Sequence, residues 1–224
     1  MCFKMSYLKL AGMICLLMLG LAVSATATTW DAYADWSNTS NPNGQYMCGT
    51  RTTVDGTSFT TFDTNSLLWG VYQAWTVGGA WDVGGLVAKN ATAGNLIQQP
   101  GVGAYSVLRW KSNVDALVNI DVTWSNTSWT SADAHLVHNG TSIYDCAVNW
   151  AGPVSQHRAE SINVHVGDTI EAVVGSGTNG YPGDDGTNLW FTVSTAPVPE
   201  PSSILAMLSG LVGLGGVVLR RKIK

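Results

Sequence analysis

The chain has few basic residues outside its two ends. Residues 28–198 contain 14 acidic side chains and only five basic ones, which gives a formal charge of −9. A field of that sign repels phosphate backbones, so we expect no nucleic-acid partner. The same charge also keeps a protein soluble, and it therefore does not by itself point to a partner.

Cysteine is scarce as well. Cys2 and Cys15 lie within residues 1–27, which leaves only Cys48 and Cys146 in the rest of the chain. An even pair in an oxidising compartment favours a disulfide between these two residues. Two separately buried thiols are the alternative, because sequence does not fix the distance between them. Two cysteines alone are a poor metal site.

The common catalytic motifs are missing. The chain has no G-x-S-x-G elbow, no H-E-x-x-H helix and no glycine-rich loop of the phosphate-binding type. This absence predicts that the protein is not an enzyme. An extracellular hydrolase remains an alternative, but its site would have to be assembled from scattered Asp, Glu and His side chains.

Between the two hydrophobic ends, helical periodicity gives way to period-two alternation. Three segments show it clearly, at residues 30–36, 118–124 and 189–193, where every second side chain is apolar. This pattern is typical of antiparallel strands with one face on a core and the other in solvent.

Turn residues separate these runs. Asn139-Gly140 stands between two apolar segments and predicts a hairpin whose two central residues have positive φ. Residues 41–44, Asn-Pro-Asn-Gly, predict a turn after the first strand. Many short strands with such turns favour an all-β, antiparallel, jelly-roll-like β-sandwich over residues 28–194. A closed barrel is the less favoured alternative.

The N-terminus has the features of a secretory signal peptide. Lys4 and Lys9 precede an apolar stretch over residues 10–23, and Ala25-Thr26-Ala27 follows as an A-x-A cleavage site. We therefore predict a signal peptide over residues 1–27.

The C-terminus combines a proline-rich linker, an apolar run and a basic end. Residues 195–203 contain Pro199-Glu200-Pro201, whose two prolines keep the tripeptide extended and accessible. The apolar run of residues 204–219 spans about 24 Å as a helix, against about 30 Å for a hydrocarbon core, so it predicts a short transmembrane helix. The basic residues after it should stay in the cytoplasm; they are Arg220, Arg221, Lys222 and Lys224.

This order of tripeptide, single hydrophobic span and basic end resembles the PEP-CTERM sorting signal of exported bacterial proteins. The resemblance implies handling by an exosortase, a membrane transpeptidase, after transient membrane anchoring. It also implies delivery to the cell surface or extracellular matrix. A permanent C-terminal tail anchor without cleavage is the alternative.

Tryptophan is the most distinctive residue of the body, the part of the chain between the two hydrophobic ends. Trp30, Trp36, Trp110 and Trp124 are in phase with apolar strand faces, and we expect them in the core. Four others lie near Gly, Asn and Ser and are candidate flat platforms for sugar rings; they are Trp75, Trp81, Trp129 and Trp150.

A glycine-rich segment over residues 176–188 contains the pair Asp184-Asp185. Clustered carboxylates and carbonyls of this kind suit Ca²⁺, although the spacing matches no EF-hand loop and an ordinary solvated turn is the competing interpretation. We predict no other cofactor.

Together these features predict an exported, non-enzymatic surface or matrix protein that contacts extracellular polysaccharide. A dedicated carbohydrate-binding module with a defined ligand is the alternative, and the extracellular hydrolase is a second one. Fold class by itself does not separate them.

Overall fold

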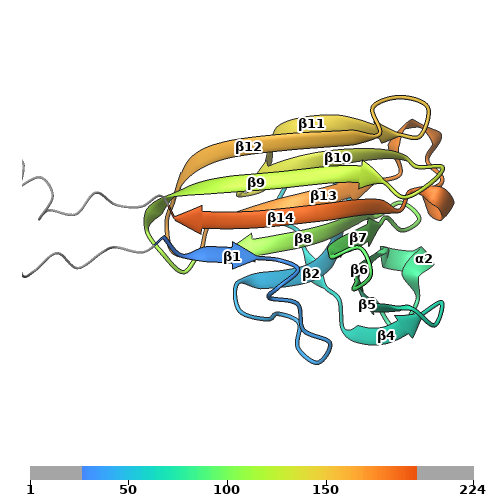
Figure 1. The fold of residues 1–224 in the computed structure, drawn as a ribbon, viewed down its shortest axis with the longest axis horizontal. Coiled ribbons are helices and arrows are strands. Elements are labelled where there is room, and N and C mark those ends of the chain that lie inside the picture. Colours follow the sequence, from blue (N-terminus) through green and yellow to red (C-terminus); the bar gives the residue numbers. More distant parts are fainter. Residues whose placement is uncertain (1–26, 196–224) are drawn as a thin grey trace, which may run out of the picture. The chain divides into compact units, whose positions relative to one another are not determined.

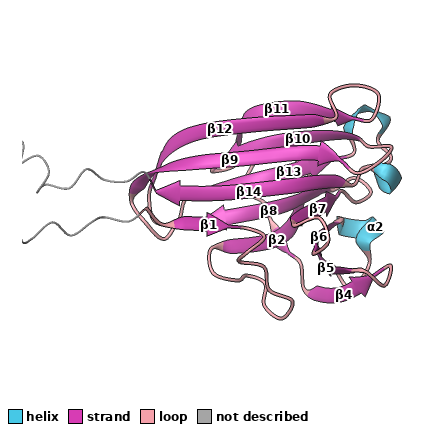
Figure 2. Cartoon of the chain, in the orientation of Figure 1, coloured by secondary structure: helices cyan, strands magenta, loops and turns pink. Residues whose placement is uncertain are grey.

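The computed structural model describes residues 27–195, which form two antiparallel sheets packed face to face (Figures 1 and 2). The eight-stranded sheet has the order β12-β9-β14-β7-β6-β5-β4, with β1 beside β14, and the six-stranded sheet has the order β11-β10-β13-β8-β2-β3. This arrangement confirms the predicted all-β antiparallel sandwich.

The elements are β1 (Thr29–Asp31), β2 (Tyr46–Arg51), β3 (Thr60–Thr61), β4 (Thr64–Leu68), β5 (Tyr72–Thr76), α2 (Trp81–Gly84), β6 (Leu86–Asn90), β7 (Asn95–Gln99), β8 (Tyr105–Lys111), β9 (Ala116–Asn126), β10 (Ser131–His138), β11 (Thr141–Asn149), β12 (Ser155–Val164), β13 (Thr169–Gly175), η1 (Gly177–Asn179), η2 (Pro182–Asp184) and β14 (Thr187–Thr195).

Apart from the β10–β11 hairpin, consecutive strands from β7 to β14 lie in opposite sheets. Strands β7, β14, β9 and β12 are neighbours in one sheet, and β8, β13, β10 and β11 are neighbours in the other. This is the order that two Greek keys produce when they fold over one another. The loops that connect these strands therefore gather at the two ends of the sandwich.

The main core lies between the sheets and is built from the alternating apolar side chains of both. Trp110 and Trp124 are completely buried, and Trp30 packs on Trp110 with ring centroids 5.2 Å apart. Trp36 is only half-buried but packs against the same core. The expectation of core positions is thus confirmed for Trp30, Trp110 and Trp124.

The predicted hairpin at Asn139-Gly140 is confirmed. It joins β10 to β11, and the two residues have φ values of 50° and 79°. Positive φ at both positions is what a tight hairpin needs to follow the twist of its strands.

The predicted strand over residues 30–36 is wrong beyond its first part. β1 ends at Asp31, whose Oδ1 accepts the backbone N–H groups of Tyr33 (2.9 Å) and Ala34 (3.0 Å). The N–H of Asp35 then donates to the carbonyl of Asp31 at 2.8 Å. An aspartate that bonds its own following backbone favours a turn over a strand, and this local effect overrides the alternating pattern.

Several predictions fall on residues outside the described range. They are the signal peptide, the sorting tripeptide Pro199-Glu200-Pro201, the transmembrane helix over residues 204–219 and the basic end. Among residues 27–195, no helix is long and apolar enough to cross a membrane.

Candidate functional site

Three loops meet at one end of the sandwich because of the direction in which their strands run. They are residues 127–130 between β9 and β10, residues 150–154 between β11 and β12, and residues 176–186 between β13 and β14. In Figure 1 they lie at the end opposite to the start of β1 and the end of β14. We call this loop-bearing end the distal end.

Two of the predicted platform residues lie together at the distal end. Trp129 and Trp150 have ring centroids 4.7 Å apart and an interplanar angle of 63°. Their side chains remain exposed to 64 % and 52 %, although each ring covers part of the other. Sequence alone could not bring these residues together, because they are contributed by different loops.

The backbone around this tryptophan pair is tied to its neighbours. The N–H of Trp150 donates to the carbonyl of Thr130 at 2.9 Å. The hydroxyls of Thr127 and Thr130 both donate to the carbonyl of Gly186, at 2.8 and 2.7 Å. The three loops are therefore linked through hydrogen bonds, and the two rings are carried on a fixed base.

The other two predicted platform residues are elsewhere. Trp75 is only 7 % exposed, belongs to the main core and donates its Nε1–H to the carbonyl of Ser37 at 2.9 Å, so the platform prediction is wrong for it. Trp81, in α2, is half-buried against a small apolar cluster on the outer side of β5, β6 and β7. The glycines near both residues lie in turns, and both rings pack against apolar side chains of the protein.

Asp184 and Asp185 do not form a shared pair. Asp184 is exposed, whereas Asp185 is buried and its Oδ1 accepts the N–H (2.8 Å) and the hydroxyl (3.0 Å) of Ser131. Burial raises the pKa of Asp185. In the described part of the chain, no three or more His, Cys, Asp or Glu side chains are grouped as a metal site. The Ca²⁺ hypothesis therefore receives no support from the arrangement of these two carboxylates.

The predicted disulfide is contradicted, because Cys48 and Cys146 are free thiols. Cys48 lies in β2 and Cys146 in β11, and strands β10, β13 and β8 separate them in the six-stranded sheet. Four strand spacings amount to about 19 Å. A disulfide requires Cα atoms within about 7 Å.

Sequence reasoning missed an ionic cluster around His135. Its Nδ1 lies 2.5 Å from Asp145 Oδ1, and its Nε2 lies 2.8 Å from Asp133 Oδ2. Burial by itself would lower the pKa of His135, but the two carboxylates outweigh burial and raise it. Both ring nitrogens can donate only in the imidazolium form, so this geometry favours a charged histidine. No local motif marks the cluster, because Asp145 comes from the neighbouring strand.

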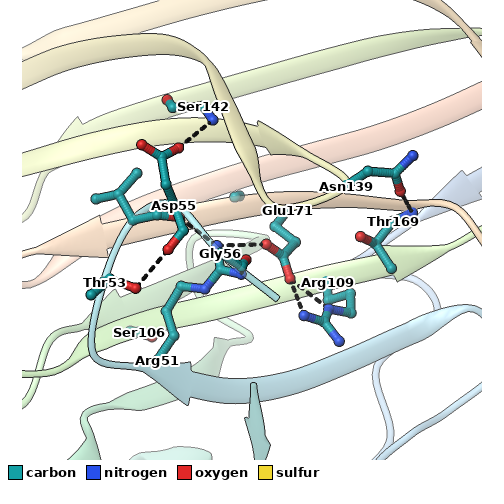
Figure 3. Close-up of polar contacts among 12 residues, drawn as sticks. Arg51, Thr53, Asp55, Gly56, Ser106, Arg109, Asn139, Ser142, Thr169 and Glu171 are labelled. Atoms are coloured by element: carbon teal, nitrogen blue, oxygen red, sulfur yellow. Dashed lines mark hydrogen bonds and ion pairs between the residues drawn. The ribbon is translucent and has the colours of Figure 1, made fainter. Parts of the chain in front are cut away.

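A second missed feature covers the outer face of the six-stranded sheet (Figure 3). Residues 52–59, which we call the strap, cross this face, and Val54 and Phe59 pack on Val107, Val137 and Val173. Polar contacts hold the middle of the strap: the N–H of Ser142 donates to Asp55 Oδ1 at 2.8 Å, and the N–H of Gly56 donates to the carbonyl of Gly140 at 2.7 Å.

Three charged side chains lie beneath the strap, of which Arg51 and Glu171 are buried and Arg109 is partly exposed. Glu171 is completely buried; its Oε2 is 2.9 Å from Arg51 Nη1, and its Oε1 is 2.5 Å from Arg109 Nη2. Arg51 also donates to the carbonyls of Val54 (2.6 Å) and Gly56 (2.7 Å). The ion cluster therefore joins β2, β8 and β13 to the strap.

Trp190 was also missed. It is 41 % exposed on the outward face of β14, while its neighbours Leu189 and Phe191 are buried. The alternating pattern was sufficient to place it outward, since the residues on either side of it were predicted to face the core.

A protein-family model, the PEP-CTERM protein-sorting motif, matches residues 197–222. The chain thus carries the motif of an exported protein that is sorted to the cell surface. No curated protein matches the chain.

Among solved structures, a family 35 carbohydrate binding module from Clostridium thermocellum is 9 % identical, with 77 % of this chain and 100 % of that chain covered and a TM-score of 0.36. A CBM51 from Clostridium perfringens GH95, in complex with methyl-galactose, is 11 % identical over 60 % of this chain and 94 % of that chain, with a TM-score of 0.34. A CBM35 from Paenibacillus barcinonensis is 13 % identical over 75 % and 98 %, with a TM-score of 0.29. Likenesses of this degree do not establish a shared ligand.

Proposed function

We propose that this protein, which carries a PEP-CTERM sorting motif, is a non-enzymatic surface or matrix protein whose body contacts extracellular polysaccharide through Trp129 and Trp150. In this proposal an exosortase acts at Pro199-Glu200-Pro201 while residues 204–219 anchor the chain transiently in the membrane. The body is then released to the surface or matrix. The exposed tryptophan pair is the observation that carries the binding part of the proposal.

Removing the exposed apolar surface of the two tryptophan rings from water would favour the binding of a partner that covers them. Trp129 and Trp150 keep more than half of their surface exposed while touching each other. Covering what remains of each ring would contribute about 2–3 kcal/mol, at about 25 cal/mol per Å². The apolar faces of sugar rings are suited to such flat surfaces.

The surroundings of the pair suit hydroxyl groups. Asn126 and Asn149 border the two loops, and Asn126 Nδ2 donates to the carbonyl of Ser128 at 3.2 Å, which fixes its amide. Amides can both donate to and accept from sugar hydroxyls. With a formal charge of −9 from 14 acidic and five basic residues between 28 and 198, the body favours a neutral polymer over an acidic one.

The test is affinity electrophoresis of the exported protein in gels that contain polysaccharides selected by a glycan array. We expect the double variant Trp129→Ala/Trp150→Ala to lose at least tenfold in affinity while keeping its melting temperature within a few degrees. Trp69→Ala is the matched control, because Trp69 is equally exposed (61 %) but lies on the β4–β5 hairpin. The proposal fails if the folded double variant is retarded as strongly as the wild type.

A further inference from the structure

The outer face of β12, β9 and β14 is open, whereas other parts of the two outer sheet faces are covered. The strap lies on the six-stranded sheet, and Leu68, Tyr72 and Trp81 pack over the outer side of β5, β6 and β7. Figure 1 shows β12, β9 and β14 side by side without a covering segment among the described residues.

Strand register arranges the outward side chains of this face in rows. One row contains His157, Thr123 and Trp190, because His157 pairs with Thr123 and Thr123 with Trp190. The next two rows are Ala159, Asp121 and Thr192, and then Ser161, Asn119 and Ser194. Directly opposed residues share a face of the sheet, so these nine side chains all face outward.

The last two rows enclose a shallow depression of about 610 Å³. The outward-facing residues that line it are Asn119, Asp121, Ala159, Ser161, Thr192 and Ser194. Ile120 and Glu160 also border it, but Ile120 belongs to the core and Glu160 pairs with Arg158. Ala159, on the edge strand β12, contributes only a methyl group, which leaves room beside Asp121 and Ser161. The volume is in the range of small-molecule sites, about 300–1,000 Å³. Because successive rows are about 7 Å apart, Trp190 stands one row from the depression and can border a ligand held there.

The groups around the depression are fixed by contacts with each other. The hydroxyl of Ser161 donates to Asn119 Oδ1 at 2.7 Å. His157 Nε2 lies 3.1 Å from Asp121 Oδ2 and holds that carboxylate in place. Hydroxyls, an amide and one carboxylate can pair with vicinal hydroxyls, and an exposed indole can cover a sugar face.

Charge narrows the ligand class further. Asp121 is the only acidic side chain directed outward in these three rows, and no lysine or arginine is directed outward beside it. The one basic group in these rows is His157, which already pairs with Asp121 at 3.1 Å. An acidic sugar would therefore meet a carboxylate with no lysine or arginine beside it, within a body that is already strongly acidic. A neutral sugar meets no such repulsion.

We infer that the depression on β12, β9 and β14 is a binding site for a neutral sugar unit, separate from the tryptophan pair at the distal end. Asp121 and Asn119 bind hydroxyls, Thr192, Ser194 and Ser161 complete the rim, and Trp190 covers one side of the ring. The inference shares only the ligand class with the proposed function.

The test is an NMR titration of the ¹⁵N-labelled exported protein with neutral disaccharides (cellobiose, xylobiose and maltose) and with acidic digalacturonate. We expect at least one neutral disaccharide to shift the amide signals of Asn119, Asp121 and Thr192, and digalacturonate to leave them unchanged. Asp121→Asn should weaken binding about tenfold or more, as expected for the loss of hydrogen bonds to a charged group. Trp190→Ala should weaken it to a similar extent.

Ala159→Phe is designed to fill the depression and should abolish these shifts. Ala147→Phe is its matched control, because Ala147 is also an exposed alanine and lies on β11, an edge strand of the other sheet. The shifts should persist in Trp129→Ala/Trp150→Ala, so that failure here and failure of the proposed function are separate results. The inference is overturned if no neutral disaccharide shifts these amides, or if Ala159→Phe binds like the wild type.

Discussion

The buried charges beneath the strap allow a quantitative prediction for Glu171→Gln. Glu171 is the carboxylate that pairs with both Arg51 and Arg109, and both its side chain and that of Arg51 are almost inaccessible to solvent. Removing one partner of such a cluster leaves buried charge without compensation, which costs about 3–5 kcal/mol. The total stability of a domain is about 5–15 kcal/mol, so the loss is a large part of it.

The assay for this variant is urea unfolding, followed by thermal unfolding. For a domain of this size, 3–5 kcal/mol corresponds to a fall in melting temperature of about 6–20 °C. Glu160→Gln is the control: Glu160 pairs with Arg158 in a partly exposed ion pair, so its loss should cost less than about 1 kcal/mol. If Glu171→Gln costs no more than Glu160→Gln, the reasoning about buried charge is refuted.

The strap gives this prediction a second readout. Arg51 holds the carbonyls of Val54 and Gly56, so a cluster that has lost Glu171 should hold the strap less firmly. We expect limited proteolysis of Glu171→Gln under native conditions to cut within residues 52–59 faster than in the wild type. Unchanged cleavage within the strap would show that its apolar contacts alone hold it.

Three further predictions concern other parts of the body. The pKa of His135 is raised by Asp133 and Asp145, so the stability that it contributes is complete below the unfolded pKa of about 6.5 and is lost as pH rises through the folded pKa. The urea midpoint of the wild type should therefore fall as pH rises above about 6.5, and this dependence should be weaker in His135→Gln. An unchanged slope would contradict this assignment. Reductant should leave the melting temperature unchanged, because Cys48 and Cys146 are free thiols. Burial raises the pKa of Cys146 to about 11, so mass spectrometry should find Cys146 alkylated slowly in the folded protein and Cys48 alkylated only after unfolding. A disulfide-linked peptide pair would contradict this. Trp124→Ala should cost about 3–5 kcal/mol in urea unfolding whereas Trp129→Ala costs less than about 1 kcal/mol, and equal losses would place both rings in the core.

Period-two patterns predicted the sheets well where the pattern was uninterrupted. Val118, Ile120, Val122 and Trp124 are buried along β9 as expected. The pattern failed after Asp31, where a side chain that bonds its own backbone ends the strand. Periodicity describes the fit of a segment to a core, but it does not include local polar contacts of this kind.

The candidate sites were less accessible from sequence because they depend on contacts between distant segments. Trp129 and Trp150 could be selected as residues near polar loops, but Trp75 satisfied the same criterion and is in the core. The predicted disulfide between Cys48 and Cys146 rested only on there being two cysteines in the body, whereas the strand order places them far apart in the sheet. The depression beside Asp121 requires the register of three strands, which no local pattern specifies.

Localisation in the producing cells gives the most direct test of the polysaccharide contact. The cells would express either the wild type, Trp129→Ala/Trp150→Ala or Trp69→Ala, and the fractions of exported protein in the matrix and in the medium would be measured. We predict that the wild type and Trp69→Ala stay in the matrix, whereas the double variant is folded and found mainly in the medium. Retention of the folded double variant in the matrix at the wild-type level would contradict the proposed role of the tryptophan pair.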